Sequence, residues 1–318
     1  MADPSPIRAW HWAGFILAIL VCVGLDLGVF HREPRVVKLS QALRWTGIWL
    51  LLALAFACLL AQWRSEEESL QFLAGYLVEY SLSLDNVLAI AIIFSSFGVA
   101  AEHQHRVLSL GIVGALLMRG IMIGAGAALL QTFHWLLFGM GLFLLVTGLR
   151  WGFSKPSPLR PQDNPAIRLA RKFFRVSDNF DNDRFVTWLG GRRALTPLAL
   201  VVLAVETTDL IFAIDSIPAV FAVTQNAFIV FTSNIFAILG LRSLYFVVAG
   251  AIGTFRYLRT GLACVLVFIG LKMLIMPWWK APTGLSLGVV LVIVALAIAC
   301  SLLSARGDQS RGDNHTPS

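Results

Sequence analysis

Residues 79–90 read EYSLSLDNVLAI and residues 209–220 read DLIFAIDSIPAV, and the two stretches align without a gap at an offset of 130. Both begin with an acidic residue, have an aspartate six positions later, and continue with an asparagine or serine and a β-branched residue. Acidic side chains are rare inside apolar segments, where each costs about 2.5–3.5 kcal/mol on insertion scales. The repeated acids therefore predict that one structural unit occurs twice and that these acids carry its function.

The surrounding chain is predominantly apolar. Of its 318 residues, 58% are hydrophobic and 14% are charged, and the mean hydropathy is +0.77, whereas soluble domains carry about 25% charged residues. The apolar runs show no period-two alternation, so helices rather than barrel strands would satisfy the backbone in a bilayer. The sequence predicts an all-α polytopic membrane protein with nine transmembrane helices of about 20 residues or more. The predicted helices span residues 10–30, 45–63, 72–98, 107–130, 133–152, 196–222, 227–250, 257–276 and 284–303.

The charges of the loops orient these helices. Residues 31–44 contain four basic residues and one acid, and residues 150–193 contain ten basic residues and four aspartates. Residues 64–71 contain three glutamates and one arginine. Because basic loops stay in the cytoplasm, the N-terminus is predicted outside and the C-terminus inside, across a bacterial inner membrane. The same rule explains the net charge of +7 without a nucleic-acid partner.

Each copy of the repeat comprises three helices. The third helices end alike, at 143–150 (FLLVTGLR) and 266–272 (LVFIGLK). Because three is odd, the helices with Asp85 and Asp215 run in opposite directions, so we expect two inverted three-helix repeats, as in many secondary transporters. Pro218 is a candidate for a helix interruption. The predicted organisation is two N-terminal helices (1–66), a first repeat (67–152), a cytoplasmic loop (153–195), a second repeat (196–277), a final helix (278–304) and a cytoplasmic tail (305–318).

The intramembrane acids form the candidate site. On a straight helix, Glu79 and Asp85 lie about 120° and about 9 Å apart, so they do not share one ion, whereas Asn86 returns to the face of Glu79. We therefore expect a site that combines both repeats. Fixed pairing of two arginines with two carboxylates is the structural alternative, although the acids outnumber these arginines. The predicted metal ligands are Glu79, Asp85, Asn86, Glu206, Asp209 and Asp215, and the supporting polar and charged partners are Arg119, Ser216, Asn234 and Arg242.

The chemistry of these ligands restricts the ion. Carboxylate, amide and hydroxyl oxygens suit hard cations such as Mn²⁺, Mg²⁺ and Ca²⁺. Neither histidine nor cysteine accompanies the acids in the sequence, so a zinc-type site is disfavoured. The sequence predicts no tightly bound cofactor and a transported divalent cation, with Mn²⁺ first and Ca²⁺ as the alternative.

These motifs resemble those of the TerC family of bacterial membrane proteins. The resemblance is carried by residues 79–91 (EYSLSLDNVLAIA), 215–223 (DSIPAVFAV) and 231–245 (FTSNIFAILGLRSLY), and it extends over nearly the whole chain, including the two N-terminal helices of the longer, Alx-like branch. It implies membership of the wider LysE-type exporter group and a role in manganese efflux, alkaline-pH response or tellurium resistance. By this resemblance, the six predicted ligands occupy the family's acidic motif positions.

The sequence thus predicts a transporter that exports divalent cations, either coupled to protons that share its carboxylates or driven by the cation's own gradient. No Walker-type nucleotide motif occurs. The alternative is a non-transporting membrane scaffold that assists assembly or metallation of partner proteins through the 153–195 loop. An intramembrane hydrolase is disfavoured because no second catalytic group accompanies the acids, so no enzyme activity is expected. The expected partners are the lipid bilayer, the metal ion, protons and proteins that dock on this loop.

Overall fold

The residues that the structure describes form ten helices and one β-hairpin. The computed structural model describes residues 7–30, 39–133, 135–153, 164–177, 179, 181, 184–189, 191–249, 257–279 and 281–312. The elements are α1 (Ala9–Phe30), α2 (Leu39–Trp63), α3 (Glu66–Phe97), α4 (Ala101–Thr132), α5 (Leu136–Phe153), α6 (Pro165–Phe173), β1 (Val186–Leu189), β2 (Arg192–Leu195), α7 (Pro197–Phe221), α8 (Ala227–Ala249), α9 (Leu258–Ile275) and α10 (Thr283–Gly312).

Eight helices within the described part of the chain, α2–α5 and α7–α10, are long and apolar enough to cross a membrane. This confirms the prediction of an all-α polytopic membrane protein. The remaining long helix, α1, is apolar over Ala9–Gly24, and its role as a ninth span stays a prediction. The observed helices overlap the predicted stretches, but α2, α3 and α4 each begin six residues earlier than predicted, and α10 continues beyond position 304 to Gly312.

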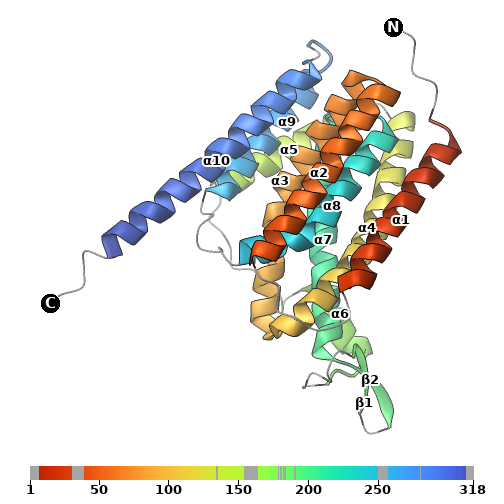
Figure 1. Ribbon diagram of the computed structural model, residues 1–318, viewed down its shortest axis with the longest axis vertical. Helices are drawn as coiled ribbons and strands as arrows, with labels where there is room; N and C mark the ends of the chain where they lie inside the picture. The colour runs from red at the N-terminus through yellow and green to blue at the C-terminus, as the bar shows by residue number, and fades with distance from the viewer. Residues whose placement is uncertain are drawn as a thin grey trace.

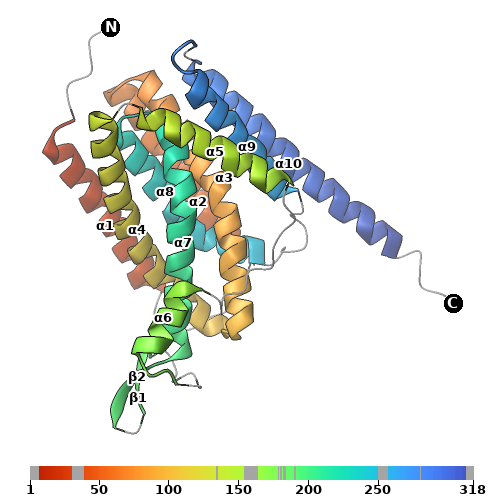
Figure 2. The same ribbon diagram turned by 180° about the vertical axis from the view of Figure 1, so that it is seen from behind.

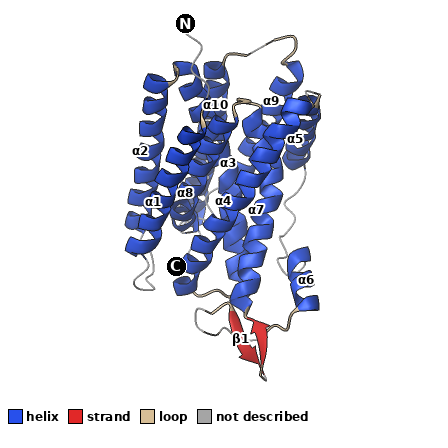
Figure 3. Ribbon diagram, turned by 90° about the vertical axis from the view of Figure 1, so that its right-hand side faces the viewer, coloured by secondary structure: helices blue, strands red, loops and turns tan. Residues whose placement is uncertain are grey.

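The long helices pack into one bundle. Figure 1 shows the N-terminus at one end of the bundle and α6 with the hairpin at the other, and Figure 3 shows the same arrangement from the side. The most buried helices are α3 and α8, whereas α2, α5 and α10 expose most of their surface. In Figure 2, α10 runs obliquely beside α9, away from α1 and α4. The acid-bearing helix α3 is therefore central, and the exposed apolar helices face the expected lipid.

The ends of α3 follow from its sequence. Ser65 is the N-cap, and its side chain accepts a hydrogen bond from the backbone N–H of Glu68 at 3.1 Å. Glu66 and Glu67 also lie in the first turn, where the helix dipole favours negative charge. Gly98 ends the helix with φ 63°, a left-handed conformation that glycine adopts without steric cost.

Helix α7 begins in a similar way but contains a proline near its other end. Thr196 caps it, accepting a hydrogen bond from the N–H of Ala199 at 3.4 Å, and Pro197 occupies the first turn. The helix continues through Pro218 to Phe221, so the interruption predicted at Pro218 does not occur. The proline lies in the last turn, where its missing N–H removes only one helical hydrogen bond.

Glycines bring the backbones of α5 and α9 together. A methyl group added at Gly148 would lie 2.9 Å from the carbonyl oxygen of Ala263, and one added at Gly270 would lie 2.6 Å from the backbone nitrogen of Leu145 and 2.8 Å from the carbonyl oxygen of Gly141. The contacts run in opposite sequence order, so the two helices are antiparallel. Small residues at such contacts are typical of membrane helices packed by van der Waals contact.

The same antiparallel relation holds for α3 and α7, because Glu79 lies beside Ser216 whereas Asn86 lies beside Asp209. Helices at equivalent positions of the two predicted repeats thus pair antiparallel, as inversion requires. The inverted repeat itself stays a prediction.

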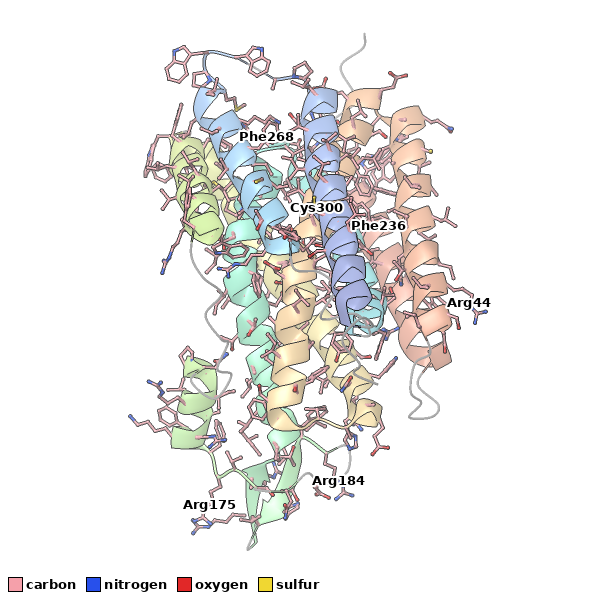
Figure 4. The ribbon with its side chains drawn as sticks, turned by 90° about the vertical axis from the view of Figure 1, so that its left-hand side faces the viewer. Arg44, Arg175, Arg184, Phe236, Phe268 and Cys300 are labelled. Carbon is pink, nitrogen blue, oxygen red and sulfur yellow. The ribbon has the colours of Figure 1, made fainter. Side chains whose placement is uncertain are left out.

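Aromatic residues join the two N-terminal helices to the bundle. Phe15 of α1 and Phe56 of α2 lie 5.6 Å apart between ring centroids, and Phe56 lies 5.2 Å from Phe236 of α8, which is labelled in Figure 4. Trp12 and Phe228 add a perpendicular contact at 5.2 Å. Helices α1 and α2 therefore pack against α8.

The predicted 153–195 loop contains regular structure. Asn164 caps α6, and Pro165 starts it. On α6, Ile167 and Ala170 are buried in the same apolar cluster as Leu198 of α7. Strands β1 and β2 pair antiparallel and lie at the far end of the bundle (Figure 1). The segment is thus folded against the start of α7.

Candidate functional site

A fully buried arginine lies at the centre of the site. Arg119 of α4 has a side-chain exposure of 0% and forms ion pairs with Glu79 of α3 and Asp209 of α7. The contact with Asp209 is bidentate, with Nη2–Oδ1 at 2.8 Å and Nε–Oδ2 at 3.3 Å. Glu79 and Asp209 are the first acids of the two repeated stretches, so one guanidinium joins equivalent positions of the two halves.

Amide and hydroxyl groups from three helices complete this network. Arg119 Nη1 also donates to Asn234 Oδ1 of α8 at 3.3 Å and to Ser216 Oγ of α7 at 3.5 Å. Asn86 Nδ2 donates to Asp209 Oδ1 at 3.2 Å, and Ser216 Oγ donates to Glu79 Oε1 at 3.4 Å. Four helices, α3, α4, α7 and α8, therefore meet at one polar point inside an apolar bundle.

Several buried polar atoms around this point have no hydrogen-bond partner within the part of the chain that the structure describes. Three of them are oxygens on α3, namely Glu79 Oε2, Ser83 Oγ and Asn86 Oδ1, and the fourth is Asn234 Nδ2. Leaving such an atom unpaired costs about 1–3 kcal/mol. All three α3 oxygens can coordinate a hard cation, and Glu79 Oε2 can also take up a proton, so the network has unused ligand capacity.

Glu206 lies on the same side of α7 as Asp209 and faces α4. Its carboxylate occupies the space beside Gly114, where an added methyl group would collide with it, and it also approaches Gly111. A glycine at position 114 is therefore required for the observed position of this acid. Small residues at a helix contact let two backbones approach closely, a signal that the predicted ligand list did not use.

Asp85 and Asp215 are partly buried on α3 and α7, and neither side chain forms a hydrogen bond or an ion pair with a described residue. Between residues 7 and 312, with the gaps given above, no three acidic, histidine or cysteine side chains are grouped to hold a metal ion. The structure thus brings together Glu79, Asn86 and Asp209 of the predicted ligands, around Arg119, and leaves the other three outside this network.

A small cavity of about 30 Å³ adjoins the network. It is lined by residues of α3, α4, α7 and α8, including Asp209, Gly111 and Arg242. Arg242, predicted as a counter-charge, is buried and donates a hydrogen bond to Ser109 Oγ at 3.3 Å. A cavity of this volume holds about two water molecules or one ion, so one carboxylate of the network borders accessible space.

Comparison with known proteins identifies the family of the chain. The family model described as "Integral membrane protein TerC family" matches residues 64–309. An uncharacterised membrane protein, STKORF319, of Myxococcus xanthus is 47% identical over 303 residues, covering 95% of each chain. The "putative membrane-bound redox modulator Alx" of Escherichia coli strain K12 is 41% identical over 311 residues, covering 95% of this chain and 97% of the relative. No solved structure matches. The chain belongs to the TerC family of integral membrane proteins.

Proposed function

We propose that the protein exports divalent metal cations, with Mn²⁺ as its main substrate, and that protons share the carboxylates with the metal. The observation that carries this proposal is the arrangement around Arg119, where carboxylates from both halves of the chain enclose one positive group. A buried position that holds a cationic side chain between acids from two units also suits a mobile cation. Binding at the interface of two halves is the arrangement that alternating access requires.

The charges at this position support a cation as the substrate. Arg119 brings one positive charge, whereas Glu79 and Asp209 bring two negative charges when ionised. Asp85, Glu206 and Asp215 lie within the same spanning helices. Because uncompensated charge inside a membrane is costly, protons or a metal ion must neutralise the excess. Metal binding then releases protons, since the ligands bind the metal in their deprotonated form.

Binding of a metal ion and binding of Arg119 compete for the same oxygens. An ion that takes Asp209 as a ligand must displace the guanidinium from at least one of its two contacts. The cavity beside Asp209 gives the ion a position from which to do so. In the described arrangement Arg119 stabilises the acids, so metal binding requires these contacts to rearrange.

The ligand set favours hard cations and membrane transport over thiol chemistry. The network contains carboxylate, amide and hydroxyl oxygens, which suit Mn²⁺ and Ca²⁺. The four cysteines lie on four different helices, so a thiol-based redox function of the kind that the name of the Escherichia coli relative suggests has less support. By the positive-inside rule, the end with α6 and the hairpin lies in the cytoplasm of the bacterial cell.

Liposomes that contain the protein and a Mn²⁺-sensitive dye test the proposal. We expect saturable Mn²⁺ entry that Ca²⁺ inhibits by competition. In the Asp215→Asn variant the apparent affinity for Mn²⁺ should be roughly 10- to 100-fold weaker, because even changes outside the direct ligands of a metal site lower metal affinity by this factor. Asp215 lies outside the Arg119 network, so this change leaves the buried ion pairs intact. Glu102→Gln, an equivalent change at the exposed start of α4, is the matched control. Folded wild-type protein without flux under either a metal or a pH gradient would reject transport and favour the scaffold.

The position of Glu206 gives a second test. Gly114→Ala places a methyl group where the Glu206 carboxylate now lies, and we expect the flexible side chain to move aside with little loss of stability. Mn²⁺ flux should then fall, because the Glu206 carboxylate moves away from the side of α7 that it shares with Asp209. Gly124→Ala on the same helix meets nothing within 4 Å and serves as the control. Equal flux in the two variants would show that the position of Glu206 is immaterial to transport.

A further inference from the structure

A large pocket lies at the end of the bundle that carries α6 and the hairpin. Its volume is about 770 Å³. One wall is the last turn of α3, with Ser96 and Phe97, and another is the first turn of α7, with Pro197 and Leu200. The remaining wall is the end of α6 and the residues after it, 171–177, together with Leu189 of β1. The pocket is thus built from the ends of the two acid-bearing helices and lies outside the Arg119 network.

Basic and aromatic side chains line this pocket together. Arg171, Lys172 and Arg175 contribute positive charge to the lining, within a segment, residues 164–196, that has seven basic residues and three aspartates. Phe173 and Phe174 also line it, and they are 70% and 60% exposed. Exposed aromatic rings next to cationic groups are typical of protein surfaces that lie in the headgroup region of a membrane.

The pocket is held in place by hydrogen bonds to the end of β2 and by the packing of α6 on α7. The backbone N–H of Ser177 donates to the carbonyl of Leu195 at 2.8 Å, and the N–H of Leu195 donates to the carbonyl of Arg175 at 2.8 Å. Burial of Ile167 and Ala170 fixes α6 against the same helix. The basic side chains therefore extend from an ordered backbone, so a ligand does not have to order the segment to bind.

The length of α3 places the pocket near the membrane surface. Its 32 residues span about 48 Å at 1.5 Å per residue, whereas the hydrocarbon core is about 30 Å thick. One or both ends of α3 therefore extend into the headgroup region. The pocket adjoins the end at Phe97, beside the polar segment that cannot enter the hydrocarbon. Figure 4 labels Arg175 and Arg184 at this end of the molecule.

We propose that this pocket binds the headgroup of an anionic phospholipid, with Arg171, Lys172 and Arg175 around the phosphate and Phe173 and Phe174 against the lipid's apolar part. A soluble phosphate compound shares the phosphate chemistry. The exposed phenylalanines favour the lipid, because their rings make apolar contacts with a bilayer and make none with a soluble ion. A lipid in this position contacts the ends of both α3 and α7. The proposal is independent of the transported substrate.

The test uses full-length protein in detergent micelles with dioleoyl-phosphatidylglycerol or dioleoyl-phosphatidylcholine, and native mass spectrometry to count retained lipids. The test variant is Arg171→Gln/Lys172→Gln/Arg175→Gln. The matched control, Arg184→Gln/Arg192→Gln/Arg193→Gln, removes the same charge from the same segment outside the pocket lining. Wild-type protein should prefer the anionic lipid. With about 1 kcal/mol per basic residue, the pocket variant should bind it roughly 100-fold more weakly, and the control should retain most of the binding.

Three results would overturn the proposal. Equal loss in both triple variants would indicate general attraction to a basic surface, and no loss in the pocket variant would exclude the pocket. Displacement of phosphatidylglycerol from the wild type by excess inorganic phosphate would assign the pocket to a soluble anion. If the triple variant does not fold, the single change Lys172→Glu at an exposed position is compared with Arg193→Glu and judged by the same criteria.

Discussion

Replacing Arg119 by methionine is expected to lower the free energy of unfolding by about 3–5 kcal/mol, the cost of removing one partner from a buried ion pair. The change leaves Glu79, with a side-chain exposure of 1%, and Asp209, with 14%, without their common counter-charge. Both acids would have to take up protons or remain as uncompensated charges inside the bundle. Equilibrium unfolding in mixed detergent micelles measures the effect.

Two further variants show whether the loss arises from charge. In Arg119→Met/Glu79→Gln/Asp209→Asn the charges are removed together, and we expect most of the stability to return because a neutral replacement of a buried ion pair is often neutral or stabilising. Arg44→Met changes an arginine at an exposed position of α2, labelled in Figure 4, and should unfold like the wild type. If Arg119→Met unfolds at the same denaturant concentration as Arg44→Met, the buried ion pairs do not stabilise the fold.

Gly270→Ala is expected to destabilise the protein by about 1–3 kcal/mol, the usual cost of overpacking. The three atoms nearest to the added methyl group would all be backbone atoms of α5, at 2.6–3.0 Å. Backbone atoms cannot rotate away as a side chain can, so α5 and α9 would have to separate along their length. The loss of their close contact lowers the van der Waals packing that holds membrane helices together.

The same substitution on an open helix face provides the control. A methyl group added at Gly288 of α10 meets nothing within 4 Å, and alanine is a better helix former than glycine by about 1 kcal/mol. Gly288→Ala should therefore unfold like the wild type or at a higher denaturant concentration. If Gly270→Ala behaves in the same way, α5 and α9 are free to move apart, and their contact does not contribute to stability.

The spanning helices could be predicted from the sequence because their signal is local. A run of about 20 apolar residues has only one way to satisfy its backbone in a bilayer, and the predicted stretches accordingly match α2–α5 and α7–α10. The structure inside residues 153–195 was not predicted. The segment contains few apolar residues. Helix α6 is stabilised by burial of Ile167 and Ala170 against α7, a contact between separate elements that no local pattern reveals.

The site was predictable in its composition but not in its connections. The rarity of acids in apolar helices identified Glu79 and Asp209, and the presence of Arg119 in the same environment suggested pairing. The sequence could not show that one arginine contacts both acids, because that depends on how α4 rotates between α3 and α7. Helix geometry separated Asp85 from Glu79 and placed Asn86 on the face of Glu79, and the network contains Glu79 and Asn86. It gave no position for Asp215, since spacing along one helix does not define which neighbour a side chain faces.

The contact between Arg119 and Asp209 has a consequence for the order in which the protein is made. The two residues are separated by 90 positions, so α3 and α4 enter the bilayer before the ribosome has synthesised α7. At about 5–20 residues per second, Arg119 and Glu79 wait on the order of ten seconds for their third partner. The first half of the chain thus completes its fold only with the second, and chains truncated before Asp209 should be degraded faster in pulse-labelled cells than chains truncated after α9.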